Sequence, residues 1–351
     1  MAAAREPAPL AERLRAQLLS GPPADGPAEV VERLLAVQGQ DPRGLRLAVR
    51  ARSTVESADE VDRALGEERS LIVTWLNRGT LHLVRREDYP WLQALIAPRW
   101  LTANTRRLAQ EGVEPAAADR AVTAIEGALA AEGPLTRDEL GERVASAGVR
   151  TEGQALVHLL FRACLRGLAV RGPMKGRQHA YVLVRDWLGE PRPVDRDAAL
   201  AELARRFLAG HGPADDRDLA KWTGLPLRDV RAGLGAIGGE LHERADGLVD
   251  LAGRPPVTEL PAPKLLGPFE PLLLGWRSRE ELVGAHTDAV ISGGIFRPAV
   301  LVDGRVVGTW TLRGDELTIT RFSRIDDAAD ASLEIESEAV LRFLGLVSPR
   351  A

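Results

Sequence analysis

The sequence predicts an α+β protein in which three helix-rich segments each end in a β-hairpin and a strand-rich segment follows them. Apolar residues recur at helical spacing in runs of short helices, and each series of runs is followed by two strands around a turn. Helices followed by a β-hairpin are the element order of a winged helix, with the hairpin as the wing. We therefore expect three tandem winged helices at residues 1–112, 113–192 and 193–254, and a β-rich domain at residues 255–351.

The composition is typical of a globular protein in aqueous solution. The 351 residues are 45% hydrophobic but only 4% aromatic, so Leu, Val and Ala must form most of the core. The net charge of −4 gives no overall basic field, so any contact with nucleic acid needs a local basic patch. A single cysteine, Cys164, excludes a disulfide framework and lies in an apolar run, where we expect a buried, inert thiol. Without a membrane-length run or a secretion signal, the expected state is a cytoplasmic monomer.

A turn of unusual chemistry, Val37-Gln38-Gly39-Gln40-Asp41-Pro42, separates the predicted helices at 27–37 and 43–52. Two amides in a tight turn can hold a water or a polar ligand, although the same residues also suit a solvated loop. Asp41 is either a functional carboxylate or the N-cap of the second helix, because Asp is a strong N-cap and Pro favours the first helical position.

Three arginines, Arg43, Arg46 and Arg50, share one face of that second helix. The row is either a solvated surface or a stripe that faces DNA phosphates. Its position directly after Asp41 favours the phosphate-facing interpretation.

The first predicted hairpin joins strands at 71–76 and 80–84 through Arg78-Gly79. Thr80 and His82 alternate with leucines and so share one face of the return strand. His82 is either a site residue, acting best when charged, or a buried imidazole that satisfies a backbone carbonyl. We expect the site role, with Arg78 and Thr80 binding DNA beside it.

The second and third segments repeat this order. Thr136 and Glu139 form the pattern of a helix-starting capping box, and a later hairpin has a basic tip with Lys175 and Arg177 that we expect to bind DNA phosphates. The other expected helices span residues 116–131, 152–166, 195–210, 215–222 and 226–237, and short strands follow at 241–244 and 248–251.

The last hundred residues change character after a proline-rich linker at Pro255, Pro256, Pro261 and Pro263. Turns at Asp303-Gly304 and Arg313-Gly314-Asp315 join strand-like runs, so residues 265–319 predict a small β-barrel or strongly bent sheet. A helix at 337–346 is expected to close it.

The sequence contains no convincing cofactor-binding motif. The glycines at 233, 235 and 238 have dinucleotide-site spacing, but they end a helix instead of following a strand. The six histidines are scattered, so we expect neither a metal nor a cofactor.

Several blocks of the sequence, in order, resemble the bacterial winged-helix DNA glycosylases of the AlkZ and YcaQ type. The resemblance covers nearly the whole chain. It rests on Gln38-Gly39-Gln40, on residues 74–83 (TWLNRGTLHL), 219–225 (LAKWTGL), 272–277 (LLLGWR) and 293–298 (GGIFRP), and on 302–310 (VDGRVVGTW).

The resemblance implies three tandem winged helices, a C-terminal β element and cleavage of the N-glycosidic bond of bulky or crosslinked N7-alkylguanines in double-stranded DNA. The family's catalytic motif is Gln, an aliphatic residue, then Gln or Asp. Gln38 and Gln40 match its ends, and Gly39 departs from its middle. Two other functions are left open: a catalytically silent DNA-binding protein or regulator, and a scaffold whose winged helices bind protein.

Overall fold

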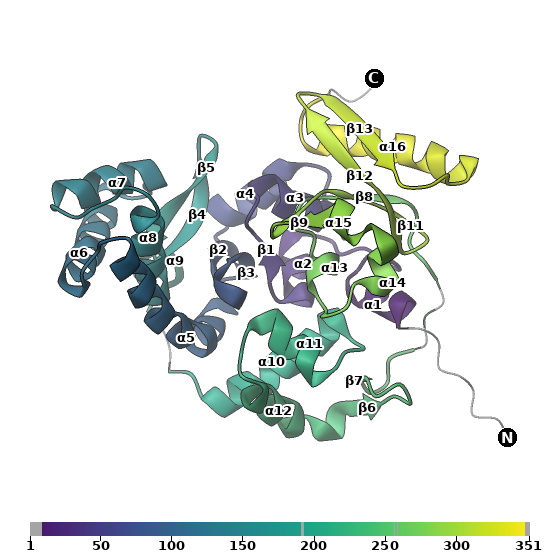
Figure 1. Ribbon diagram of the computed structural model, residues 1–351, viewed down its shortest axis with the longest axis horizontal. Coiled ribbons are helices and arrows are strands. Elements are labelled where there is room, and N and C mark those ends of the chain that lie inside the picture. The colour runs from purple at the N-terminus through teal and green to yellow at the C-terminus, as the bar shows by residue number, and fades with distance from the viewer. Residues whose placement is uncertain (1–8, 191–192, 256, 258, 348–351) are drawn as a thin grey trace. The chain divides into compact units, whose positions relative to one another are not determined.

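The computed structural model describes residues 9–190, 193–255, 257 and 259–347 (Figure 1). The chain divides into two compact units, of which unit 1 combines residues 1–61 with 200–351 and unit 2 comprises residues 62–199. The described residues mix helix with sheet, as the sequence predicts at that level. The division into two units is coarser than the four predicted domains, which remain a prediction.

Unit 2 is built on four antiparallel strands in the order β3-β2-β4-β5. The strands are β2 (Leu71–Trp75), β3 (Leu81–Arg85), β4 (Ala169–Lys175) and β5 (Gln178–Leu183). The helices are α5 (Tyr89–Gln110), α6 (Pro115–Glu132), α7 (Arg137–Ser146), α8 (Ala155–Leu165) and α9 (Val184–Leu188), and the 3-10 turn η1 (Asn77–Gly79) joins β2 to β3. Helix α4 (Ala58–Gly66) includes the point in the sequence, between Val61 and Asp62, where unit 1 gives way to unit 2.

Helix α8 forms the centre of unit 2. It packs against α5 and α6 and buries eight of its eleven residues, among them Leu159, Phe161 and Cys164. A helix that is apolar on nearly every side belongs in a core. Burial raises the pKa of the Cys164 thiol to about 12, which confirms the predicted inert cysteine.

The sequence patterns predict no element over residues 89–110, where the structure has the 22-residue helix α5. Pro90 occupies the first turn and Pro98 lies inside the helix, and prolines at these positions predict interruptions of a helix. Packing against α8 supplies the stabilisation that the local sequence lacks.

Unit 1 brings together the two ends of the chain. Its N-terminal part contains α1 (Leu10–Ala16), α2 (Pro27–Leu34), β1 (Val37–Gln38) and α3 (Pro42–Arg50), and its central part contains α10 (Arg196–His211), α11 (Asp216–Thr223), α12 (Leu227–Ala236), η2 (Gly238–Glu240), β6 (Leu241–Glu243) and β7 (Val249–Leu251). The C-terminal part contains β8 (Lys264–Leu266), α13 (Pro271–Leu274), α14 (Glu280–Val283), η3 (Gly284–His286), α15 (Thr287–Val290), β9 (Ile291–Ser292), β10 (Ile295–Phe296), β11 (Ala299–Val302), β12 (Arg305–Arg313), β13 (Glu316–Arg321) and α16 (Asp327–Phe343).

The C-terminal strands form an open sheet in the order β13-β12-β11-β8, so no closed barrel exists among the described residues. The predicted turn at Asp303-Gly304 is confirmed, because both residues have the positive φ angles that such a two-residue hairpin needs. Helix α16 begins after the N-cap Asp326, ten residues before its predicted start, and contacts β8. Of the four linker prolines, Pro256 lies outside the described residues.

A buried ion pair connects the N- and C-terminal parts of unit 1. Arg52 Nη2 lies 2.5 Å from Glu270 Oε1, and both side chains are fully buried. Arg52 also donates to the Ala48 carbonyl and to the Gln17 side chain, and Glu270 accepts the backbone N–H of Leu272. Removing one partner of such a pair costs about 3–5 kcal/mol, so these contacts hold residues far apart in sequence in one core.

Candidate active site

The Gln38-Gly39-Gln40 turn follows a strained backbone bend at Leu35. Helix α2 ends at Leu34, before its predicted end at Val37, because Leu35 takes a left-handed φ of 63°. Gln38 then closes β1 with only 7% of its side chain exposed, whereas Gln40 is exposed. One amide is thus held by burial and the other reaches solvent.

Asp41 caps the helix that follows. Its Oδ1 accepts the Gly44 N–H at 2.7 Å, so the N-cap interpretation describes the observed role of this carboxylate. The start of α3 is fixed in place by Gly44, where an added Cβ would lie 2.4 Å from the Pro268 carbonyl oxygen. Close backbone packing therefore positions the turn that carries both glutamines.

The three arginines of α3 do not form the open stripe that the sequence suggests. Arg46 is buried and donates to the Pro42 carbonyl at 2.5 Å, and Arg50 makes a bidentate pair with Glu336 at 2.8 and 2.9 Å. Arg43 alone of the three is fully on the surface. The geometry corrects the expectation, because the other two side chains turn toward the protein.

His82, in unit 2, is buried with 2% exposure, and its Nδ1 lies 3.0 Å from the Thr80 carbonyl oxygen. Burial, followed by the charge of Arg78, lowers the pKa of His82 to about 3. The ring is neutral at neutral pH, so Nδ1 must carry the proton that it donates to Thr80. The geometry favours the alternative of a buried ring that satisfies a carbonyl over a charged imidazole, and a site role for His82 stays a prediction.

The turn before His82 has an unusual backbone. Arg78 and Gly79 both take left-handed φ angles, and Thr80 Oγ1 donates to the Asn77 carbonyl at 3.0 Å. Asn77 is 1% exposed, and within the described residues neither atom of its side-chain amide has a hydrogen-bond partner. Asn77 was not among the predicted site residues, although an asparagine directly before Arg78-Gly79 is a signal that could have identified it.

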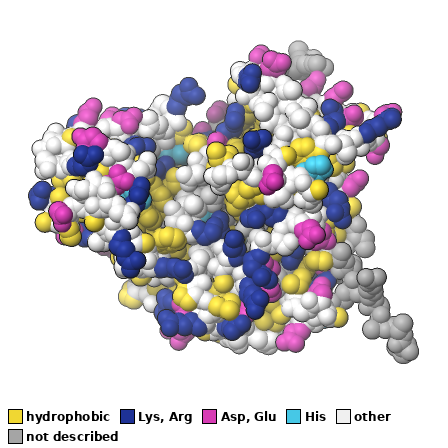
Figure 2. Space-filling model, in the orientation of Figure 1, with side chains coloured by type: hydrophobic (Ala, Val, Ile, Leu, Met, Phe, Trp, Pro, Cys, Tyr) yellow, Lys and Arg dark blue, Asp and Glu magenta, His cyan; other side chains and the backbone are white. Residues whose placement is uncertain are grey.

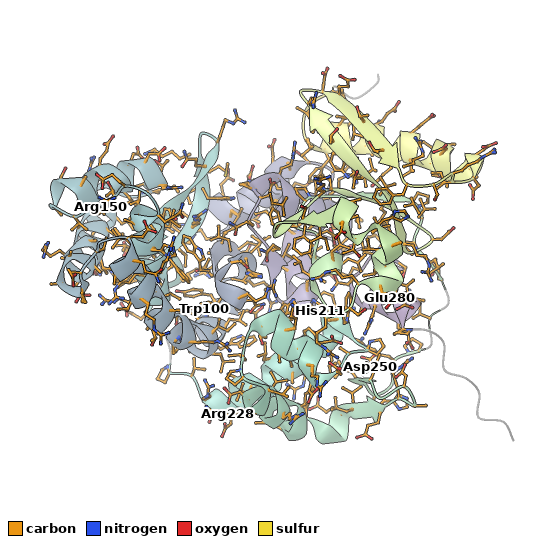
Figure 3. All side chains as sticks on the ribbon, viewed as in Figure 1. Trp100, Arg150, His211, Arg228, Asp250 and Glu280 are labelled. Carbon is orange, nitrogen blue, oxygen red and sulfur yellow. The ribbon has the colours of Figure 1, made fainter. Side chains whose placement is uncertain are left out.

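Trp100, labelled in Figure 3, packs over this turn. A Cβ added to Gly79 would meet the indole ring at 3.3 Å, so only glycine allows the ring to approach so closely. The indole N–H is buried and has no acceptor in the described part of the chain. The Trp100 indole N–H and the Asn77 amide are thus buried polar groups without hydrogen-bond partners, across the described ranges, at one turn. Protein cores generally avoid such groups away from functional sites.

The basic hairpin tip of unit 2 is partly neutralised. Lys175 Nζ lies 2.6 Å from Glu139 Oε1, while Glu139 Oε2 completes the predicted capping box with Thr136. The hydrogen bond from Lys175 is the largest cause that lowers the pKa of Glu139 to about 2. Arg177 is exposed at the tip.

Unit 1 also carries exposed basic residues outside the predicted DNA-binding set. Figure 2 shows Lys and Arg side chains gathered over α10, α11 and α12. Arg217, Lys221, Arg228 and Arg231 are exposed there, and Figure 3 labels Arg228.

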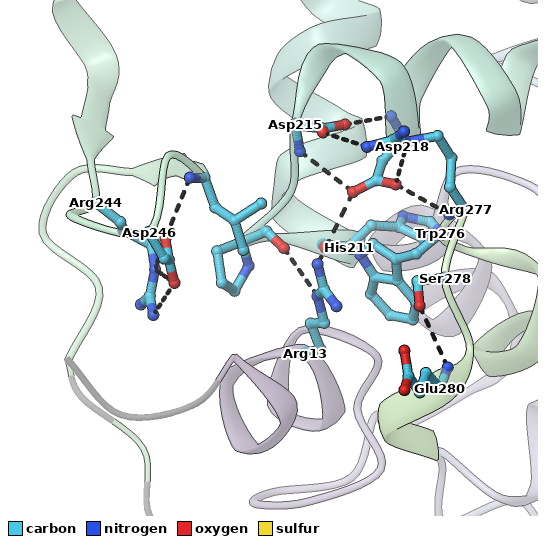
Figure 4. A network of polar contacts seen from close by, with 12 residues as sticks. Arg13, His211, Asp215, Asp218, Arg244, Asp246, Trp276, Arg277, Ser278 and Glu280 are labelled. Atoms are coloured by element: carbon cyan, nitrogen blue, oxygen red, sulfur yellow. Dashed lines mark hydrogen bonds and ion pairs between the residues drawn. The ribbon is translucent and has the colours of Figure 1, made fainter. Parts of the chain in front are cut away.

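A polar network supports the start of α11 (Figure 4). Asp215 and Asp218 form a capping box, and Arg277 binds both carboxylates, with 2.7 Å from its Nη2 to Asp215 and 2.9 Å from its backbone N to Asp218. The Arg13 guanidinium lies over the Trp276 ring at 4.8 Å from the centroid. These contacts fix the segment after α13 against the helices that carry the basic surface.

Among the residues described, no group of three or more His, Cys, Asp or Glu side chains could hold a metal ion. Within the same ranges, none of the helices is both long enough and apolar enough to span a membrane.

The class of protein follows from comparison with known families. A family described as AlkZ-like DNA glycosylase matches residues 31–343, and the chain belongs to that family. It is therefore an enzyme that hydrolyses N-glycosidic bonds in DNA.

Individual relatives agree with this assignment. The chain is 30% identical to the "Interstrand DNA cross-link repair glycosylase" of Streptomyces sahachiroi, with 95% of each chain covered. Its structure is similar to that of the Streptomyces sahachiroi DNA glycosylase AlkZ, with a TM-score of 0.78 and 27% identity over 96% of each chain. The resemblance stated from the sequence is confirmed.

Proposed function

We propose that this DNA glycosylase acts on bulky or crosslinked N7-alkylated purines in double-stranded DNA, and that Gln38 and Gln40 form its catalytic centre. The observation that carries the proposal is the Gln38-Gly39-Gln40 turn, which is held between the strained Leu35 and the capped start of α3. The name of the Streptomyces relative, which refers to interstrand crosslinks, supports the substrate class.

The chemistry suits neutral amides. An N7-alkylated guanine carries a positive charge and leaves readily, so the enzyme needs no strong general acid. Its task is to place a water and to stabilise a sugar that develops oxocarbenium character, which is a matter of orientation and electrostatics. Gln38 would hold the water from its buried position, and Gln40 would contact the deoxyribose from the surface. Asp41 serves as a positioning residue through its cap on α3.

His82 takes a different part from the one first expected. With Nδ1 donating to Thr80, the neutral ring presents Nε2 as an acceptor. It suits a hydrogen bond from a water or an amino group better than an ion pair with a phosphate.

We also propose that the three helix–hairpin segments act as winged helices on DNA. Arg43, Arg78, Thr80 and Arg177 would contact the backbone. Lys175, Arg46 and Arg50 would contribute less, because acidic side chains or backbone carbonyls already bind them.

The test is base release from DNA that contains N7-methylguanine. Gln38→Ala and Gln40→Ala should each reduce the rate about tenfold to a thousandfold with little change in DNA affinity, since a water-positioning group contributes about that much. Gln110→Ala, which truncates an exposed amide in α5, is the matched control and should release base at the parent rate.

Equal rates in the parent protein and in both glutamine variants would show that the catalytic centre lies elsewhere. A parent protein that binds the DNA but releases no base would instead support the catalytically silent alternative.

A further inference from the structure

A second candidate site lies in unit 1, in a cavity of about 340 Å³. Its charged lining residues are Glu12 and Arg15 on α1, Arg33 on α2, and Asp250 and Arg254 at and after β7. None of them belongs to the Gln38–Asp41 turn. Figure 3 labels Asp250.

The walls of this cavity are fixed by contacts to the end of α10. Arg254 Nη2 donates to the Ala209 carbonyl at 2.6 Å, and Gln17 Nε2 donates to the Gly210 carbonyl at 2.7 Å. A Cβ on Gly210 would lie 2.3 Å from the Arg33 carbonyl oxygen, so α2 and α10 pack backbone to backbone. The cavity is therefore built from a rigid frame.

The acids in the cavity already have partners. Asp250 pairs with Arg254 at 3.0 Å, and Glu12 pairs with Arg244 at 2.6 Å. Arg15 and Arg33 make no side-chain hydrogen bond or ion pair within the described parts of the chain. Two guanidinium groups therefore face the cavity with no acidic side chain bound to them.

Gathering these arginines has an electrostatic cost. The Arg33 side chain reaches the surface, yet partial desolvation lowers its pKa; the charges of Arg254 and Arg15 lower it further, whereas those of Glu29 and Glu32 raise it. Arg15 reaches its place across Gly21, which has a left-handed φ of 76° and where a Cβ would lie 2.0 Å from Arg15 Nη1. The cavity thus holds three arginines beside two acids that are already paired, and an anion would stabilise the two guanidinium groups that have no such partner among the described residues.

We propose that this cavity binds a phosphate group, held by Arg15 and Arg33 with Arg254 in its wall. The planar guanidinium matches two phosphate oxygens at once, so arginines without acidic partners favour phosphate over a simple halide. The volume exceeds that of a phosphate and leaves room for the group esterified to it. The phosphate belongs either to a DNA backbone or to a small phosphorylated molecule, and the inference is independent of the catalytic role of Gln38 and Gln40.

The first experiment uses inorganic phosphate as the probe. Melting temperatures are measured against phosphate concentration at constant ionic strength for the parent, Arg15→Gln and Arg33→Gln. Phosphate should stabilise the parent, and each variant should need about tenfold more for the same rise, the loss expected for one charge-assisted hydrogen bond. Without phosphate, the variants should melt at or above the parent temperature, because a repulsive charge has been removed.

The matched control is Arg342→Gln, which removes an exposed arginine from α16 in the same unit. It should respond to phosphate as the parent does, which separates specific binding from the general stabilisation that phosphate salts give by exclusion. Arg33→Lys keeps the charge but loses the bidentate geometry, so it replaces Arg33→Gln if that variant fails to fold.

The second experiment identifies the source of the phosphate through affinity for an unmodified DNA duplex. If the slope of log affinity against log salt falls by about one in each variant, the phosphate belongs to DNA. A phosphate response with an unchanged DNA slope assigns the cavity to a small phosphorylated molecule. Equal phosphate responses in parent and variants, or no response together with an unchanged slope, would overturn the proposal.

Discussion

Helices α8 and α12 occupy the same place in two successive helix–hairpin segments, yet their surroundings are opposite. In unit 2, α8 is covered by α5 and α6 and buries most of its residues. In unit 1, α12 buries only Val230 and Gly233 and exposes Arg228 and Arg231. The same order of elements has produced a core helix in one unit and a basic surface helix in the other.

This difference shows that element order alone does not assign a DNA-reading role. In a winged helix the third helix is the one that enters a groove, which requires a free polar face. Helix α12 has an exposed polar face, on which Arg231 pairs with Asp216 and the 86% exposed Arg228 lies 3.4 Å from Asp229, whereas α8 has none. We infer that unit 2 contributes to DNA binding through its hairpin turns and that unit 1 contributes through α12 as well as through Arg43.

The largest expected effect tests the core role of α8. Leu159→Ala removes a fully buried side chain and should lower the free energy of unfolding by about 2–5 kcal/mol. Leu234→Ala makes the same change on the partly exposed α12 and should cost roughly 1 kcal/mol or less. Urea unfolding of both variants measures the contrast, and equal losses would contradict it.

A second, smaller effect concerns two buried histidines, His82 in unit 2 and His211 in unit 1. The His211 ring stacks on Phe207 and lies beside Trp222, and its burial lowers its pKa to about 3. A histidine whose folded pKa lies below its unfolded value contributes stability that is fully present above the unfolded value and lost as the pH falls toward the folded one. For both residues this window runs from about 6.5 down to about 3.

Below pH 6.5, each histidine should therefore remove up to about 1.4 kcal/mol of stability per pH unit. Denaturant unfolding between pH 7 and pH 5 measures the slope for the parent and for His82→Gln. The variant should lose less stability over this range. Parallel curves would mean that the His82 ring is protonated in the folded protein.

The smallest expected effect concerns DNA binding by α12. Arg228→Gln removes a side chain that is 86% exposed, and it should reduce the salt slope of DNA affinity by about one. Arg150→Gln is the control in unit 2, on the loop before α8, and should leave the slope unchanged. Both residues are labelled in Figure 3. The reverse result would move the DNA surface away from α12.

Local chemistry made much of the fold predictable. The capping box at Thr136 and the turn at Asp303-Gly304 depend on residues within four positions of each other, and both formed as predicted. Helix α5 was missed because Pro98 interrupts its local pattern and its support comes from α8, about 60 residues later in the sequence. Sequence spacing carries no information on such a partner.

The candidate site likewise combines features that local sequence predicts with features that depend on distant residues. The cap formed by Asp41 was one of the stated alternatives, because Asp followed by Pro is a local signal. The pairing of Arg50 with Glu336 joins residues 286 positions apart, and no helical spacing could reveal it. The neutral state of His82 also required the structure, since burial sets it.

The discontinuous make-up of unit 1 has a consequence for how the enzyme is synthesised. Helix α3 begins against the Pro268 backbone, and Arg52 pairs with Glu270, so the turn that we propose as catalytic depends on residues made more than two hundred positions later. As the ribosome extends the chain, unit 2 is complete first, because it is continuous in sequence. Residues 1–61 must wait for the C-terminal part, which ties the appearance of glycosylase activity to near-complete translation and leaves prematurely terminated chains inactive.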